Sequence, residues 1–123
     1  MENNFDSLII NEVAYIRKDS VLLPAKPADD MEYIIARTYS AGVFAGYLKS
    51  REGKECTLVN ARRLWSWQGA ASLSQLAQSG TSMPDKCKFP EEVSKVILTE
   101  VIEILSVTSQ AKEKIDMVPV WKQ

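Results

Sequence analysis

Two guanidinium and two indole side chains lie within the six-residue run RRLWSW at residues 62–67. An indole can stack on a nucleobase, which contributes about 1–3 kcal/mol, and arginine can hold a phosphate through two parallel hydrogen bonds. If the run continues a β-strand, its period of two places Arg63, Trp65 and Trp67 on one face and Arg62 on the other. The alternative is that the indoles fill the core and Arg63 packs over one of them.

The turn Tyr39-Ser40-Ala41-Gly42 is a second candidate element of this site. Turns that contain glycine can direct backbone N–H groups toward an anion, so Tyr39, Ser40 and Gly42 are predicted to join the site. The simpler interpretation is a hairpin turn between two strands.

Three further polar side chains could hydrogen-bond an exposed edge of the same ligand: Asn60, Arg62 and Arg37. The alternative is that they satisfy a loop or pair with Glu52 and Glu55, which is the commoner fate of surface charge.

Several classes of chemistry are excluded or disfavoured. The chain has no histidine, so the usual general base, zinc ligand and Ser-His or Cys-His dyad are missing. Glu100 and Glu103 could only suggest a pair of glycosidase carboxylates, and no sequence pattern around them indicates a substrate pocket. Cys56 and Cys87 match no zinc spacing and are expected to be free thiols. The sequence predicts a non-enzymatic binding protein with no catalytic residue, no metal site and no cofactor.

Charge is unevenly distributed along the 123 residues, whose net charge is −1. Residues 37–88 carry 8 basic and 3 acidic side chains, whereas residues 1–36 carry 3 and 7, and residues 89–123 carry 4 and 6. A basic middle in an acidic chain suits a small anionic ligand better than duplex nucleic acid. The chain lacks an apolar run of about 18 residues and a signal peptide, so we expect a cytoplasmic protein without membrane contact.

These candidate residues must be positioned by strands. β-branched and aromatic residues predict strands at 33–39, 43–50 and 55–61, and one or two more within 93–108. In the third strand, Cys56, Leu58 and Asn60 alternate with their neighbours and would share a face. The first three strands are expected to form an antiparallel meander.

Two capping signals predict helices. The capping box of Ser72 and Gln75 predicts a helix over 73–79. Thr108 caps a second helix over 109–115. The sum is an α+β fold: a small curled, barrel-like antiparallel sheet of about five strands with two short helices.

The chain divides into two parts. Residues 1–30 are expected to be a variable N-terminal segment and linker, because LPAKPADD at 23–30 is rich in proline and aspartate. Apolar patches at 7–10 and 13–16 could make an early strand or hairpin. Residues 31–123 are expected to form a single α+β domain.

Three runs, RTYSAGV at 37–43, NARRLW at 60–65 and GAASL at 69–73, resemble a small domain family of uncharacterised function that is common in tailed bacteriophages and prophages. The resemblance covers roughly residues 32–121. It carries no established catalytic residues. It implies a phage accessory protein acting in an infected bacterium, similar in role to inhibitors of host immunity.

Residues and resemblance together predict a phage protein that counters bacterial antiviral defence by sequestering a small nucleotide-like signal. Two alternatives stay open: an inhibitor that binds a host defence protein, and a single-stranded nucleic-acid-binding protein. An exposed sheet edge favours a homo-oligomer. The expected location is the cytoplasm of the infected bacterial host.

Overall fold

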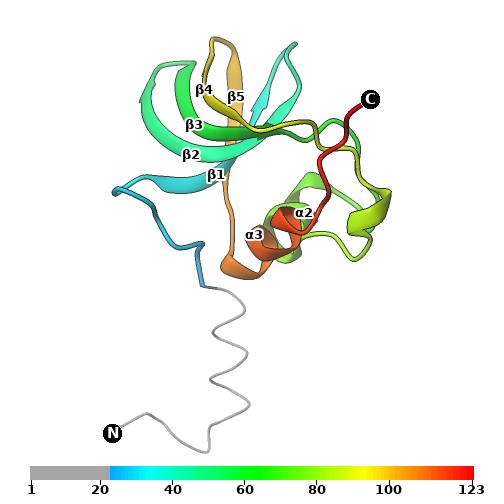
Figure 1. The fold of residues 1–123 in the computed structure, drawn as a ribbon. Helices are drawn as coiled ribbons and strands as arrows, with labels where there is room; N and C mark the ends of the chain where they lie inside the picture. Colours follow the sequence, from blue (N-terminus) through cyan, green and yellow to red (C-terminus); the bar gives the residue numbers. More distant parts are fainter. Residues whose placement is uncertain (1–22) are drawn as a thin grey trace, which may run out of the picture.

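One antiparallel sheet organises the molecule, with its strands in the order β4-β3-β2-β1-β5 (Figure 1). The computed structural model describes residues 23–123. Its strands are β1 (Glu32–Thr38), β2 (Val43–Glu52), β3 (Glu55–Arg63), β4 (Val93–Leu98) and β5 (Val101–Ser106). Its helices are α2 (Leu73–Ser79) and α3 (Ser109–Asp116), with a 3₁₀ turn, η1 (Pro84–Lys86), before β4.

The predicted α+β fold and the meander of β1, β2 and β3 are confirmed. The segment 93–108 contains two strands. The early strand or hairpin expected at 7–10 and 13–16 lies outside the described residues.

The sheet curls because a short connection joins its two edge strands. β4 and β5 lie at opposite edges, yet only Thr99 and Glu100 separate them in the chain. Four strand spacings span about 19 Å in a flat sheet, whereas three Cα steps reach at most about 11 Å. The edges must therefore approach each other. β4 and β5 do not pair within the described sheet, so it is curled but not closed into a barrel.

Each face of the sheet is covered by its own apolar cluster. The inner cluster takes residues from all five strands: Ile34, Ala36, Phe44, Cys56, Leu58, Ala61, Leu98 and Val101. The outer cluster joins the opposite face to α2 and α3, which lie on the same side of the sheet (Figure 1); it includes Ile35, Leu76, Phe89, Ile115 and Val118. Because both faces are covered, four consecutive residues of β1, 33–36, are buried.

A β-bulge at Asn60 changes the alternation of side chains in β3. Asn60 has a φ of +52°, and the pairing with β2 shifts between Ala45 and Tyr47. Ala61 therefore joins the inner cluster in place of Asn60, which is exposed. The expectation that Asn60 shares a face with Cys56 and Leu58 is wrong, because the alternation held only up to the extra residue.

Both helices begin at the predicted caps. The Ser72 hydroxyl accepts a hydrogen bond from the Gln75 backbone N–H at 3.1 Å, and the Thr108 hydroxyl accepts one from Ala111 at 3.0 Å. The Gln75 side chain reaches back to the N–H of Ala71, one residue before the cap. These bonds satisfy donors that a helix start leaves unpaired.

Candidate functional site

An open cavity of about 310 Å³ lies where the β1–β2 turn meets the chain that leaves β3. We call it the aromatic-basic cleft. Its lining is Ser40, Ala41, Gly42, Val43, Arg63, Leu64, Trp65 and Trp67. The structure thus brings together five residues predicted separately from the turn and from the RRLWSW run, namely Ser40, Gly42, Arg63, Trp65 and Trp67.

The two indoles of the cleft have different environments. β3 ends at Arg63, before either tryptophan. The prediction that the RRLWSW run continues the strand, so that strand alternation would position both indoles, is therefore wrong. Leu64 turns into the outer cluster and is 2 % exposed, whereas Trp65 is 63 % exposed. Trp67 is half-buried and packs against the outer cluster. Trp67 therefore supports the wall of the cleft, whereas the ring of Trp65 is accessible to solvent.

Arg63 lies at the exposed side of the cleft. Its guanidinium carbon is 4.5 Å from the centre of the Phe44 ring, a cation–π contact that holds the side chain against the sheet. Within residues 23–123 no carboxylate lies at ion-pair distance from Arg63. Its N–H groups are available to an anionic ligand.

The turn that forms the opposite wall is fixed by its own hydrogen bonds. Thr38 donates from its backbone N–H (3.0 Å) and its hydroxyl (2.7 Å) to the Gly42 carbonyl, and its hydroxyl accepts from Ala41. Gly42 has a φ of +96°, which favours glycine. The Ser40 hydroxyl donates to Glu100 at 2.7 Å. The Ala41 N–H is thus used within the turn, and the wall is a rigid hairpin connection.

Four predicted residues lie outside the cleft. Tyr39 is 78 % exposed beside the turn, and Asn60 is exposed at the bulge. Arg37 forms an ion pair with Glu103 at 2.7 Å, where pairing with Glu52 or Glu55 was the expected alternative. Arg62 lies over the Phe89 ring of the outer cluster, on the other face of the sheet from Arg63, which lies over Phe44 of the inner cluster.

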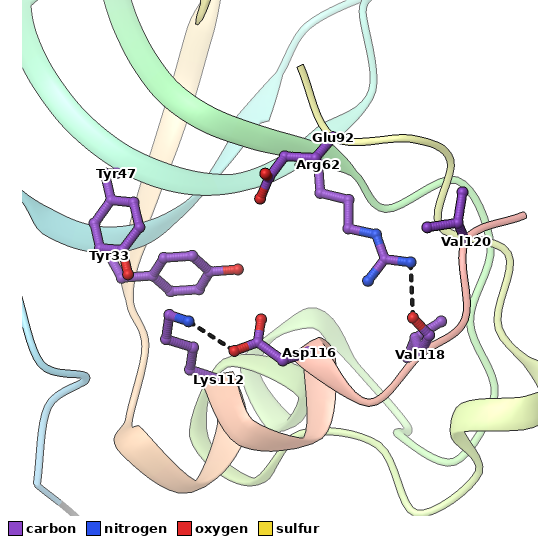
Figure 2. A pocket seen from close by; sticks show the side chains of 8 residues that line it. All are labelled: Tyr33, Tyr47, Arg62, Glu92, Lys112, Asp116, Val118 and Val120. Carbon is purple, nitrogen blue, oxygen red and sulfur yellow. Dashed lines mark hydrogen bonds and ion pairs between the residues drawn. The ribbon is translucent and has the colours of Figure 1, made fainter. Parts of the chain in front are cut away.

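Arg62 binds backbone carbonyls of three segments. It donates to Phe89 and Pro90 before β4, to Ile115 in α3, and to Val118 and Pro119 in the C-terminal segment, at 2.8–3.2 Å. Figure 2 shows the bond to Val118. Burial lowers the pKa of Arg62, but the guanidinium remains charged at any physiological pH. Its role is structural, because it ties the C-terminal segment to the sheet.

The tethered segment extends the aromatic-basic cleft with residues that the sequence analysis did not assign to it. The Trp121 ring stacks on Trp65, with 6.5 Å between centroids and 13° between planes. Lys88 lies 5.5 Å from the centre of the Trp121 ring. The contact depends on the bridge between Phe89 and Val120, and no local pattern in the sequence signals such a pairing.

A second cavity, of about 350 Å³, lies on the helix side of the sheet (Figure 2). We call it the tyrosine cavity. Its lining is Tyr33, Tyr47, Arg62, Glu92, Lys112, Asp116, Val118 and Val120. These residues come from β1, β2, β3, α3 and two loops, so only the folded chain brings them together.

Burial, and then the charge of Asp116, raises the pKa of Tyr33. Burial alone would lower the pKa of Lys112, but its hydrogen bond to Asp116 at 2.7 Å and the charge of that carboxylate raise it. At neutral pH the cavity therefore holds a neutral phenol and a charged ammonium.

Alkaline pH should destabilise the protein partly through Tyr33. In the unfolded chain this phenol loses its proton near pH 10, whereas the folded chain keeps it. The contribution is thus present below about pH 10 and is lost as the pH rises further, by up to about 1.4 kcal/mol per pH unit. Tyr33→Phe should flatten the fall in the free energy of unfolding, measured by urea denaturation between about pH 8 and pH 11. Tyr39→Phe is the control, and equal slopes for both variants would contradict the assignment.

Metal and thiol chemistry receive no support from the geometry. No group of three or more cysteine, aspartate or glutamate side chains in the described part of the chain is placed to hold a metal ion. Cys56 and Cys87 are free, as predicted, and both are buried. Burial raises the pKa of the Cys56 thiol, which disfavours the reactive thiolate. No helix of residues 23–123 has the length and apolarity to cross a membrane.

Comparison with known proteins places the fold in a family. The family model described as a domain of unknown function (DUF6948) matches residues 31–115, from the residue before β1 to the last turn of α3. No curated protein and no solved structure matches the chain. The match spans more than half of the 123 residues and contains the whole sheet. The chain belongs to the family of the domain of unknown function DUF6948.

Proposed function

We propose that this protein is a non-enzymatic binding protein whose aromatic-basic cleft holds a small nucleotide-like ligand. The observation that carries the proposal is the pairing of an exposed indole, Trp65, with a guanidinium, Arg63, that has no carboxylate partner among residues 23–123. A nucleobase stacked on Trp65 would place its phosphate within reach of Arg63. The fixed Ser40–Gly42 wall lowers the ordering cost of binding.

The biological part of the proposal is that sequestering such a ligand counters bacterial antiviral defence in an infected cell. It rests on the resemblance of the RTYSAGV and NARRLW runs to small domains of tailed phages. The protein would then act in the cytoplasm of the infected host. The outer edges of β4 and β5 are the sheet edges at which a homo-oligomer would form.

A second candidate function is supported by the stacked pair of Trp65 and Trp121. Both rings are at the surface, 63 % and 40 % exposed, with Lys88 beside them. Exposed tryptophans next to basic side chains are common anchors of protein interfaces, so the same surface could dock and inhibit a host protein.

Intrinsic fluorescence tests the proposal directly, because all three tryptophans of the chain, Trp65, Trp67 and Trp121, lie in or beside the cleft. Titration with the four ribonucleoside monophosphates and with cyclic dinucleotides should give saturable quenching for at least one of them. Adenosine has the base without the phosphate, and inorganic phosphate lacks the base, so each should bind more weakly than the nucleotide.

Arg63→Gln should weaken nucleotide binding by about tenfold or more, since a charge-assisted hydrogen bond contributes about 1.5–3 kcal/mol. Arg37→Gln is the matched control, because Arg37 is exposed, lies outside the cleft and already pairs with Glu103. Quenching by none of the nucleotides, or equal affinity in the two variants, would refute the nucleotide site. Steeply salt-dependent binding of oligonucleotides alone would favour the nucleic-acid alternative.

A further inference from the structure

The tyrosine cavity contains a buried polar group that the fold does not satisfy. Tyr33 is 5 % exposed, and its hydroxyl has no hydrogen-bond partner among residues 23–123. Figure 2 shows the hydroxyl pointing into the open space of the cavity, between the carboxylates of Glu92 and Asp116. Because the hydroxyl faces the cavity and not another protein group, a molecule that enters the cavity can form a hydrogen bond with it.

The charged groups around this hydroxyl are unequally satisfied. Arg62 gives its donors to five backbone carbonyls. Lys112 donates to one oxygen of Asp116 and lies 4.8 Å from the Tyr33 ring centre. Glu92 has no ion-pair partner in the described chain. The groups still able to bond are two acceptors, Glu92 and the second oxygen of Asp116, the N–H donors of Lys112 that Asp116 does not use, and the Tyr33 phenol, which can donate or accept.

The charge of the cavity indicates an uncharged ligand. Two cations, Arg62 and Lys112, and two anions, Glu92 and Asp116, sum to zero. An ammonium would be attracted by Glu92 and Asp116 but repelled by Arg62 and Lys112, and a phosphate would meet the reverse, so the summed charge of the lining favours neither and repays the desolvation of neither. A neutral molecule with several O–H groups can bond the carboxylates and Tyr33 without that cost.

The remaining walls fit a molecule with one apolar face. Val118, Val120 and the Tyr47 ring line the cavity beside the polar groups. The volume of about 350 Å³ is at the lower end of the range for small-molecule sites, about 300–1,000 Å³. We propose that the tyrosine cavity binds an uncharged polyhydroxyl molecule about the size of a monosaccharide. This site is separate from the aromatic-basic cleft, and its proposal is independent of the proposed function.

The test is an NMR titration of the ¹⁵N-labelled protein with D-glucose, D-galactose and D-ribose, and with charged counterparts, D-glucosamine and glucose 6-phosphate. At least one neutral sugar should bind saturably in the millimolar range, with shifts concentrated at the amides around Tyr33, Lys112 and Asp116. The charged counterpart should bind at least tenfold more weakly. Binding by none of the neutral sugars, or tighter binding of the charged probes, would overturn the proposal.

Variants separate recognition from folding. Tyr33→Phe removes a hydroxyl without a protein partner, so it should leave Tm unchanged or raise it while weakening sugar binding about tenfold. Glu92→Gln, at the exposed rim, should weaken binding without any effect on Tm. Tyr39→Phe, a matched loss of a phenol at a site 78 % exposed, should change neither. Unchanged affinity in both Tyr33→Phe and Glu92→Gln would also overturn the proposal.

Discussion

Replacing Arg62 with alanine should lower the free energy of unfolding by about 3–5 kcal/mol, the largest effect that we expect from any single polar side chain. Arg62 serves five carbonyls in three segments, and its guanidinium lies 5.4 Å from the centre of the buried Phe89 ring. Its loss leaves acceptors without donors in a partly buried place, and each costs about 1–3 kcal/mol if water does not replace the donor. For a domain of this size, Tm should fall by about 15 °C or more, measured by calorimetry.

The adjacent arginine provides the control. Arg63→Ala removes an equal side chain from the next position, but Arg63 is exposed and loses only its contact with Phe44, worth about 0.5–1 kcal/mol. The loss of stability in Arg62→Lys should lie between the losses in these two variants. An ammonium keeps the charge, but it lacks the planar guanidinium that bonds acceptors on three segments. Equal stability of Arg62→Ala and Arg63→Ala would show that the hydrogen bonds of Arg62 to the three segments do not contribute to the free energy of unfolding.

Gly69→Ala should destabilise the protein by about 3 kcal/mol. Gly69 has a φ of +83°, and a Cβ there would lie 2.5 Å from the Thr81 hydroxyl oxygen and 2.6 Å from the Met83 nitrogen. The backbone cannot yield easily, because the Ser82 N–H donates to the Gly69 carbonyl at 3.1 Å and the Thr81 hydroxyl donates to Gln68. Overpacking adds to the strain of positive φ. Urea denaturation at constant pH measures the loss.

Gly42→Ala isolates the cost of the backbone angle alone. Gly42 has a φ of +96°, but a Cβ there would meet no atom within 4 Å. The expected loss is about 1 kcal/mol. A loss at Gly69 no greater than the loss at Gly42 would contradict the steric part of the argument.

Local signals in the sequence predicted the elements that depend on local physics. Ser72 and Thr108 cap their helices because a hydroxyl at the N-cap satisfies N–H groups a few residues away. The hairpins around Gly42 and Gly53 follow from turn residues between β-branched runs. The curl of the sheet was predicted, but its strand order was not, since pairing of β1 with β5 is decided by contacts across most of the chain.

Five of the predicted ligand residues line one cleft, although whether the cleft binds a ligand stays a prediction. Trp65 and Arg63 reach the same cleft as Ser40 and Gly42, although the strand alternation used to place the indoles ends at Arg63. Arg62, which was predicted to bond the same ligand, lies outside this cleft and donates to backbone carbonyls. The carbonyls that it binds belong to segments 27 to 57 positions away in the sequence. Every residue has a backbone carbonyl, so residue types do not indicate which carbonyls will accept these bonds.

The place of β5 in the sheet has a consequence for synthesis of the protein. β1, β2 and β3 can pair in turn as they leave the ribosome, but the other edge of β1 pairs only with β5, which is made after three intervening strands. The hydrogen bonds of Arg62 to the carbonyls of Val118 and Pro119 can form only later still, once these residues have been made. Translation therefore exposes an unpaired β1 edge to other nascent chains until residue 106 has emerged, and Arg62 lacks its last acceptor until residue 119 has emerged, so folding is completed after most of the protein has been made.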